Sequence, residues 1–189
     1  MIPIITFLAM IKHLESGLDI SHVMAELEDN PKLWNAYTMR TKYANTPHLA
    51  VSDIWVRFNA WNNYQGDPVA FNEMHDSVWY GDLPAIRNLC FDVMRRVRGE
   101  RLGGVLITKI PPGGSVAPHK DKSWHADYYT KYAVQLKGNL KQSFCFETSQ
   151  LSPLPGDLYT FDNSILHWVT NESDEDRITL IICVKPETL

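Results

Sequence analysis

The sequence is poor in three features that would each have pointed to a class of protein. Its three cysteines, Cys90, Cys145 and Cys183, are widely spaced and form no C-x-x-C pair, which argues against a disulfide framework and a thiolate zinc site. Lysine and arginine (18) do not outnumber aspartate and glutamate (22), so the net charge of −4 offers no basic face for nucleic acid. No apolar run is long enough to cross a bilayer. We therefore expect a protein of the reducing cytoplasm that binds neither nucleic acid nor membrane.

Length and the apolar start bound the organisation of the chain. At 189 residues with 44% apolar content, the chain can form one domain with a substantial core and is too short for two. Residues 1–11 are apolar but lack the basic start and the cleavage site of a signal peptide, so a buried first strand or helix is expected. We expect residues 1–104 to form a helical and irregular support layer with one or more strands, and residues 105–189 to form the β core.

Residue periodicity predicts the elements of the N-terminal part. Residues 20–27 have helical spacing, and a second helix begins at Pro84, with Gly99 after its last turn as a cap. Residues 53–59 alternate as a strand does, whereas residues 60–82 are rich in Asn, Asp, Gly and Trp and predict a loop.

Beyond residue 104 the apolar period changes to two. Short strand candidates separated by Pro, Gly and Asn turns are typical of an antiparallel sandwich or barrel. We predict a mainly β (α+β) fold, a jelly roll like that of cupins, with the N-terminal helices packed on one sheet. The strand candidates are residues 105–110, 116–121, 129–136, 143–147, 157–161, 165–169 and 177–184.

Four residues in this β region carry chemistry together: His119, Asp121, His167 and Arg177. Two imidazoles and one carboxylate can occupy one face of an octahedral iron(II) and leave the other positions to a chelating co-substrate and dioxygen. A guanidinium one strand later can hold the far carboxylate of that co-substrate. The set predicts an iron(II)- and 2-oxoglutarate-dependent dioxygenase.

The chain contains a second H-x-D motif, His125 and Asp127, six positions after His119 and Asp121. On a strand, residues two apart leave the same face, which suits two ligands of one ion. The first motif ends a predicted strand, whereas the second lies in a polar, aromatic stretch that we interpret as a loop over the pocket mouth. We therefore assign the ligands to the first motif; the alternative is a surface histidine and a turn aspartate.

Each of the later site residues also has a plain structural explanation. His167 could be a core histidine bonded to backbone, and Arg177 a surface arginine paired with Asp174 or Asp176. Arg177 and Thr179 share one face of a very apolar strand, and an arginine heading a buried strand needs a partner. If that face lines a cavity, the partner is a ligand, and Thr179 joins Arg177 as a candidate contact of the co-substrate.

Several phrases in residues 113–186 resemble the aspartyl/asparaginyl β-hydroxylase branch of the 2-oxoglutarate oxygenase superfamily. The upstream strand at residues 53–58 and the helix from Pro84 resemble the family more loosely. The phrases are PHKD at residues 118–121, LPGDLYTFDNS at 154–164, HWVTN at 167–171 and DRITL at 176–180.

The resemblance implies a double-stranded β-helix, iron held by His119, Asp121 and His167, and the distal carboxylate of 2-oxoglutarate bound by Arg177. Lys131 falls where the family places a second basic residue near the co-substrate, although it could equally be a solvated strand lysine. The animal enzymes of this branch have a glycine in place of the carboxylate ligand. This chain keeps Asp121, which argues against transferring their substrate, a domain in the secretory pathway.

The reaction that the resemblance implies is hydroxylation of an unactivated C–H bond, with dioxygen as the oxidant. The substrate expected is an Asp-, Asn- or Pro-like side chain in a protein, a peptide or a free amino acid, with Arg57, Trp124 and Tyr128 as candidate contacts. A cupin-like metalloprotein with isomerase, hydrolase or ligand-binding function is the alternative. Arg177 argues against it, because such a protein has no need of a carboxylate clamp. A catalytically silent interaction module is a third hypothesis, which the complete ligand set disfavours.

Overall fold

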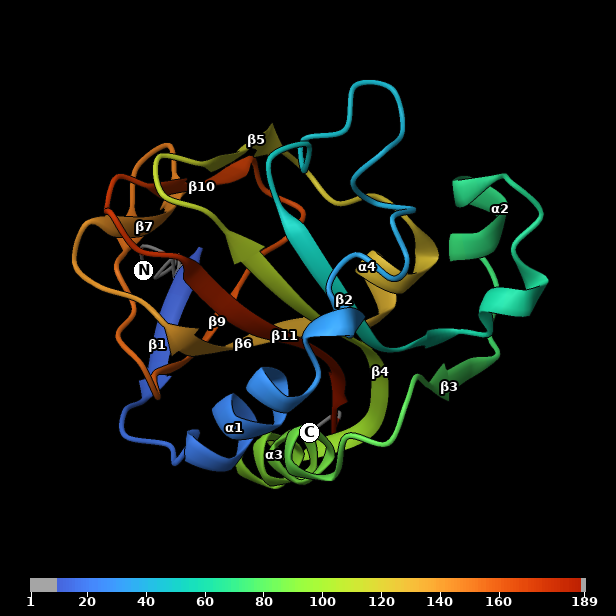
Figure 1. The fold of residues 1–189 in the computed structure, drawn as a ribbon, viewed down its shortest axis with the longest axis horizontal. Helices are drawn as coiled ribbons and strands as arrows, with labels where there is room; N and C mark the ends of the chain where they lie inside the picture. Colours follow the sequence, from blue (N-terminus) through green and yellow to red (C-terminus); the bar gives the residue numbers. More distant parts are fainter. Residues whose placement is uncertain (1–9, 188–189) are drawn as a thin grey trace, which may run out of the picture.

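The fold is a sandwich of two antiparallel sheets, shown as a ribbon in Figure 1. The structure, a computed structural model, describes residues 10–187. The buried element expected at the very start of the chain falls on residues 1–9, outside the described residues. The eleven strands of the described chain form one sheet of seven and one of four, which confirms the predicted mainly β jelly roll.

The seven-stranded sheet carries the support layer, and the four-stranded sheet lies across its other face (Figure 1). All strand neighbours in both sheets pair antiparallel. In spatial order the larger sheet contains β1 (Ile11–Glu15), β9 (Leu158–Phe161), β6 (Thr130–Lys137), β11 (Arg177–Pro186), β4 (Gly99–Ile110), β2 (Ser52–Asn59) and β3 (Ser77–Trp79). The smaller sheet contains β5 (Ser115–His119), β10 (His167–Asn171), β7 (Gln142–Phe146) and β8 (Gln150–Leu151).

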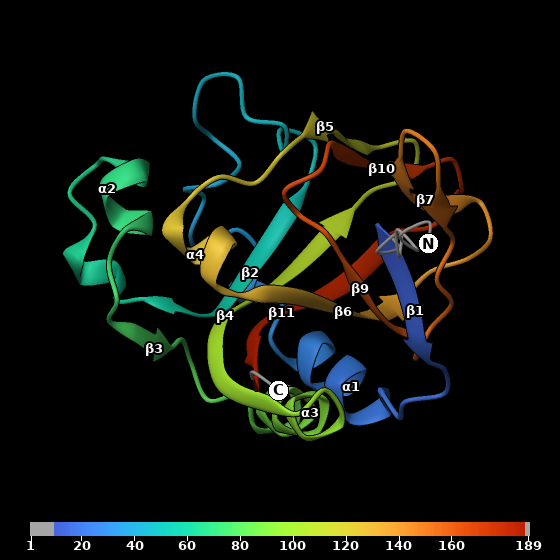
Figure 2. The same ribbon diagram turned by 180° about the vertical axis from the view of Figure 1, so that it is seen from behind.

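Two helices, α1 (Ser21–Asp29) and α3 (Pro84–Arg96), cover the outer face of the seven-stranded sheet, and both lie below it in Figures 1 and 2. Their apolar faces pack on those side chains of β2, β4 and β11 that point toward the helices. Together these residues form the larger of two buried apolar clusters. Both helices were predicted from sequence, and so was their packing on one sheet. None of the helices in residues 10–187 has the length and apolar character needed to cross a lipid bilayer.

The second apolar cluster lies between the two sheets and includes Ile110, Phe144 and Phe161. Alternation along a strand divides its side chains between the two layers. On β11, Ile178 and Leu180 belong to the helix-facing cluster, so the intervening residues face the smaller sheet. Every second side chain of β11 therefore points into the space between the sheets. The polar side chains of Arg177 and Thr179 are among these.

Two segments predicted to be loops contain short helices. Residues 60–82 include η2 (Trp61–Asn63), α2 (Pro68–Asn72) and β3, and the stretch after the H-x-D motif includes α4 (Trp124–Tyr128). The side chain of Asp67 accepts hydrogen bonds from the first turn of α2, and Ser123 does the same for α4. Each helix has a single capping residue and lies in a polar stretch where apolar residues do not recur at helical spacing. The sequence pattern therefore did not predict these two helices.

The end of α3 differs from the expected glycine cap. Arg98, with φ at 53°, takes the left-handed position, and Gly99 already begins β4. Gly99 is needed for space rather than for its φ angle. A Cβ at this position would lie 2.5 Å from Cγ1 of Val184 and 3.3 Å from the carbonyl oxygen of Met94.

We therefore expect Gly99→Ala to destabilise the protein by about 1–3 kcal/mol, the usual cost of overpacking. The added methyl group would push β11 and the last turn of α3 apart. Urea unfolding followed by circular dichroism measures this change. Gly66→Ala is an informative control, because nothing lies within 4 Å of its added Cβ and its φ of 90° isolates backbone strain. An unchanged unfolding midpoint for Gly99→Ala would show that β11 and the last turn of α3 can move apart freely.

Candidate active site

Two strands of the smaller sheet bring the predicted histidines together. His119 is the last residue of β5, His167 is the first of β10, and the two are direct partners in the antiparallel register. Asp121 lies beyond the end of β5 rather than on it, which corrects the expectation of a strand running to residue 121. Its backbone N–H donates to the carbonyl of Asn163 at 3.0 Å, so the turn before β10 fixes its position.

The donor atoms of His119, Asp121 and His167 converge within 4.8 Å of one another. Nε2 of His119 lies 3.6 Å from Oδ1 of Asp121, and the two imidazole rings are 4.4 Å apart between centroids. Ligands about 2.1 Å from one ion and at right angles are separated by about 3 Å. A small contraction of this cluster would hold a cation, and the side chains fit the predicted two-histidine, one-carboxylate set.

Backbone hydrogen bonds select which nitrogen of each imidazole faces the cluster. Nδ1 of His119 lies 2.9 Å from the carbonyl oxygen of Ala117, and Nδ1 of His167 lies 2.8 Å from that of Ile165. A carbonyl only accepts, so each Nδ1 carries the proton and donates. This leaves the lone pair on each Nε2, the arrangement in which outer hydrogen bonds orient ligating histidines.

The electrostatics of the cluster favour the protonation states that bind a metal. Burial lowers the pKa of both His119 and His167, so both rings are neutral near pH 7. For Asp121, burial is the largest single influence and favours the neutral acid, but the attraction and hydrogen bond of the Lys131 ammonium, together with the two imidazoles, outweigh it, and the pKa of the carboxyl lies below its usual value. The set thus offers two neutral nitrogens and a carboxylate, and no ligand proton has to be displaced.

Arg177 is buried between the sheets with only 2% of its surface exposed. Its Nη1 donates to Oγ1 of Thr179 at 2.6 Å and its Nη2 to the hydroxyl of Tyr159 at 3.1 Å. Both partners are neutral, and Nε has no partner among the described residues. The alternative of a surface arginine paired with Asp174 or Asp176 is therefore wrong.

Thr179 and Lys131, the other predicted co-substrate residues, lie beside Arg177 and Asp121 respectively. Thr179 accepts from Arg177 and donates to Oε1 of Gln135 at 3.2 Å, so it holds the guanidinium in place. The ammonium of Lys131 forms an ion pair with Oδ2 of Asp121. In this structure Lys131 therefore contacts a candidate metal ligand.

Two adjoining cavities meet at the cluster. The inner one, of about 50 Å³, lies between the sheets and is lined by His119, Asp121, His167 and Arg177. The outer one, of about 350 Å³, opens from His119 and Asp121 toward α4 and the segment that joins η1 (Pro31–Leu33) to β2. Since both cavities share the carboxylate and one imidazole, a molecule in the outer cavity lies next to the candidate metal position.

The second H-x-D motif has a structural role. Nε2 of His125 accepts the backbone N–H of Gly104 at 3.0 Å, and burial lowers the pKa of this histidine to about 4. His125 thus ties α4 to β4, whereas Asp127 is exposed. The assignment of the ligands to the first motif agrees with this geometry.

The three residues predicted to contact the substrate, Arg57, Trp124 and Tyr128, line neither of the two cavities. The guanidinium of Arg57 donates to the carbonyls of Leu102 and Gly103, at 3.0 and 2.6 Å. The indole of Trp124 donates to the carbonyl of Asn72 and stacks on His75, and the ring of Tyr128 lies under the ammonium of Lys185. The outer cavity is lined instead by aromatic side chains that include Trp55 and Phe58.

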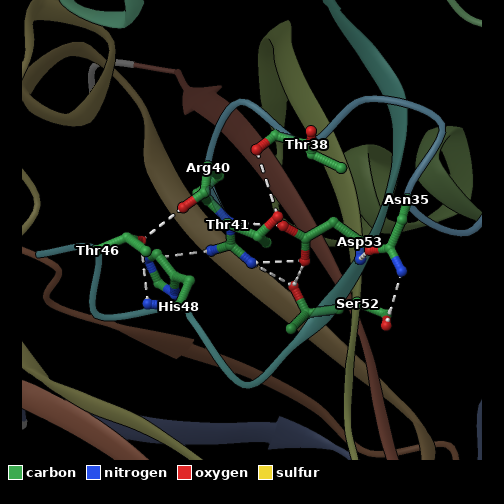
Figure 3. Close-up of polar contacts among 9 residues, drawn as sticks. Asn35, Thr38, Arg40, Thr41, Thr46, His48, Ser52 and Asp53 are labelled. Carbon is green, nitrogen blue, oxygen red and sulfur yellow. Dashed lines mark hydrogen bonds and ion pairs between the residues drawn. The ribbon is translucent and has the colours of Figure 1, made fainter. Parts of the chain in front are cut away.

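Sequence reasoning missed two polar residues of the segment that joins η1 to β2, residues 34–51, here called loop 34–51. Arg40 and His48 line both cavities, and Figure 3 shows Arg40 between His48 and Asp53. The ring of His48 contacts that of His119, with centroids 4.8 Å apart. Loop 34–51 has no periodicity, and an isolated Arg or His in it carries no signal of its own.

Comparison with solved structures places the fold among oxygenases. A 2OG-Fe(II) oxygenase family oxidoreductase from Burkholderia pseudomallei has a TM-score of 0.59 at 14% identity, covering 93% of this chain and 84% of that one. A Pseudomonas putida prolyl-4-hydroxylase has a TM-score of 0.59 at 11% identity, with 95% and 94% covered. The viral collagen prolyl hydroxylase of Paramecium bursaria Chlorella virus-1 has a TM-score of 0.53 at 10% identity, with 94% and 97% covered. At these identities the likeness concerns the fold.

Comparison of sequences is more specific. No protein of curated function matches the chain. The family model described as aspartyl/asparaginyl beta-hydroxylase matches residues 19–186, which include the candidate metal ligands and Arg177. That match includes the helices on the outer face and every strand of the two sheets except β1. The chain therefore belongs to the aspartyl/asparaginyl β-hydroxylase family.

Proposed function

We propose that this protein is an iron(II)- and 2-oxoglutarate-dependent dioxygenase that hydroxylates an unactivated C–H bond of an amino-acid-like substrate. The observation that carries the proposal is the inner cavity, which is lined both by a two-histidine, one-carboxylate cluster and by a buried guanidinium with neutral partners. A buried cation of this kind costs several kcal/mol unless an anion joins it. A dicarboxylate that also chelates the metal supplies that anion.

Each residue has a distinct task in this proposal. His119 and His167 present Nε2, and Asp121 presents Oδ1, to an iron(II) that would activate dioxygen and oxidatively decarboxylate 2-oxoglutarate. Arg177 receives the distal carboxylate with charge-assisted hydrogen bonds, oriented by Thr179 and by the hydroxyl of Tyr159. The apolar side chains in the wall of the inner cavity, among them Ile110, Phe144 and Phe161, limit access of water, and the outer cavity holds the substrate beside the cluster.

The direct test is binding followed by turnover. Purified protein, made metal-free and kept anaerobic, should bind iron(II) and then develop the visible charge-transfer absorption of a 2-oxoglutarate chelate. On admission of air it should release succinate and carbon dioxide in equal amounts. Protein that binds iron(II) but neither chelates nor consumes 2-oxoglutarate would contradict the proposal and favour a cupin-like metalloprotein.

Lys131 provides a separate prediction, because its contact with Asp121 suggests that it orients a ligand. We expect Lys131→Met to weaken Mn(II) binding by about 10–100-fold even without 2-oxoglutarate, the usual cost of losing an outer-shell partner. Lys131→Gln, which retains a donor for Oδ2, should lose less. Calorimetric titration of the metal alone measures both variants.

The same titration distinguishes this role of Lys131 from the one that the family resemblance implies, a direct contact with 2-oxoglutarate. If Lys131 instead binds 2-oxoglutarate, both variants should bind Mn(II) as the wild type does. Only the affinity of the metal-loaded protein for 2-oxoglutarate would then fall.

A further inference from the structure

Arg40 projects from loop 34–51 to the boundary of the two cavities, with one edge of its guanidinium fixed. Nε and Nη2 donate to the two oxygens of Asp53 at 2.9 and 2.8 Å, and Nη2 also donates to Oγ1 of Thr108 at 2.8 Å (Figure 3). Asp53 is 1% exposed and lies on β2. The rigid strand thus sets the orientation of a side chain that a loop supplies, which is how enzymes preorganise a binding group.

The opposite edge of the guanidinium remains available. Nη1 lies 3.4 Å from Nε2 of His48, whose ring packs against that of His119. Of the five N–H donors of a guanidinium, three are directed at Asp53 and Thr108 and one at His48. One donor at Nη1 is left, on a residue that lines both cavities together with His119 and Asp121.

His48 supplies a second, independent sign of a ligand site. The side chain is 7% exposed, and its Nδ1 has no hydrogen-bond partner among residues 10–187. Buried polar atoms without a partner are rare, and each calls for an explanation. A hydrogen-bonding group on a ligand in the cavities that His48 lines would supply the missing partner.

The charge of the outer cavity favours an anion. Its lining includes the cations Arg40, Lys120, Lys122 and Lys131 but a single carboxylate, Asp121, in a chain whose net charge is −4. Lys120 and Lys122 are exposed at the mouth. A cleft lined by one sign of charge raises the local concentration of the opposite ion. Arg40 itself is neutralised by Asp53, so the lysines balance the charge of an incoming anion.

We propose that the outer cavity binds the substrate through a carboxylate received by Nη1 of Arg40, and that the substrate is a small free carboxylic acid. Asp53 is a positioning residue for Arg40. The volume of about 350 Å³ lies near the lower end for small-molecule sites. Loop 34–51 is fastened on both sides of the cavity, by Arg40 to Asp53 and by the carbonyl of Pro47 to the N–H of Ala117 on β5. This assignment rests on the proposed function, since it names the substrate of the same site.

The test compares acids with their amides. The probes are free L-amino acids, the matching α-amides, and N-acetylated, C-amidated aspartate and glutamate, which carry only a side-chain carboxylate. Saturation-transfer NMR with zinc-loaded protein and 2-oxoglutarate measures binding without turnover. We expect at least one free acid to bind at least 10-fold more tightly than its amide. Arg40→Gln should remove this preference, whereas Lys42→Gln, which removes an exposed lysine of the same loop, should keep it.

Equal binding of acids and amides by the wild type, or no binding by any acid, would overturn the proposal even if Arg40→Gln failed to fold. A preference that survives in Arg40→Gln would exclude Arg40 as the receiving group. Binding by the blocked side-chain acids alone would replace the small molecule with a polypeptide. Failure of the proposed function would be seen in a different measurement: wild-type protein supplied with iron(II) would consume no 2-oxoglutarate.

Discussion

His167→Ala should abolish both metal binding and the release of succinate from 2-oxoglutarate. The variant loses a nitrogen ligand, so we expect the affinity for Mn(II) to fall by more than the roughly 10–100-fold that loss of an outer-shell partner costs. His167 is the natural choice because its position is fixed twice, by the register of β10 against β5 and by the bond from Nδ1 to Ile165. Calorimetry with Mn(II) and a coupled succinate assay with iron(II) measure the two losses.

The matched control is the other H-x-D histidine. His125→Ala should bind Mn(II) as the wild type does, but it should be less stable by about 1–3 kcal/mol, because the buried N–H of Gly104 loses its acceptor. His167 also packs against Phe144 and Phe161, so circular dichroism must show that the His167 variant is folded. A folded His167→Ala protein that retains wild-type metal affinity would refute the ligand assignment.

The strands were predictable from local pattern, and the candidate metal ligands were predictable from residue type and from their order in the chain. Period-two alternation beyond residue 104 reflects one face toward the helices and one toward the other sheet, and residue type restricts metal ligands to a few side chains. The placement of Asp121 beyond the strand end was not predictable. It depends on a backbone hydrogen bond to Asn163, on a turn that folds next to it only in the complete sandwich.

The substrate-facing residues could not be found from sequence for a related reason. Arg57 was a candidate because it is a polar residue in a segment expected to form the mouth of the pocket, but the register of β2 shifts between Trp55 and Arg57, and its guanidinium donates to backbone carbonyls. Arg40 gained its role from partners 13 and 68 positions away, Asp53 and Thr108. Contacts of this range leave no periodic trace in a single sequence.

Replacing Arg177 should lower the affinity for 2-oxoglutarate and raise the stability of the ligand-free protein. Arg177→Met removes the only charged group assigned to the distal carboxylate, and truncating one partner of a buried charge pair costs about 2–5 kcal/mol. We therefore expect the affinity for 2-oxoglutarate to fall by roughly 30- to 4,000-fold. The variant should accept 2-oxopentanoate, which has the same carbon chain without the distal carboxylate, at least as well as 2-oxoglutarate, whereas the wild type should strongly prefer the diacid.

The ligand-free Arg177→Met protein should at the same time be more stable than the wild type, by roughly 1–4 kcal/mol. Arg177 is 2% exposed, and among residues 10–187 its guanidinium is bonded only to the neutral hydroxyls of Thr179 and Tyr159, so its charge is a cost that methionine does not carry. Unfolding in urea without metal or co-substrate measures this gain, and saturating 2-oxoglutarate with Mn(II) should stabilise the wild type far more than the variant. A variant that is less stable when ligand-free and still prefers the diacid would show that Arg177 supports the sheet and does not receive a carboxylate.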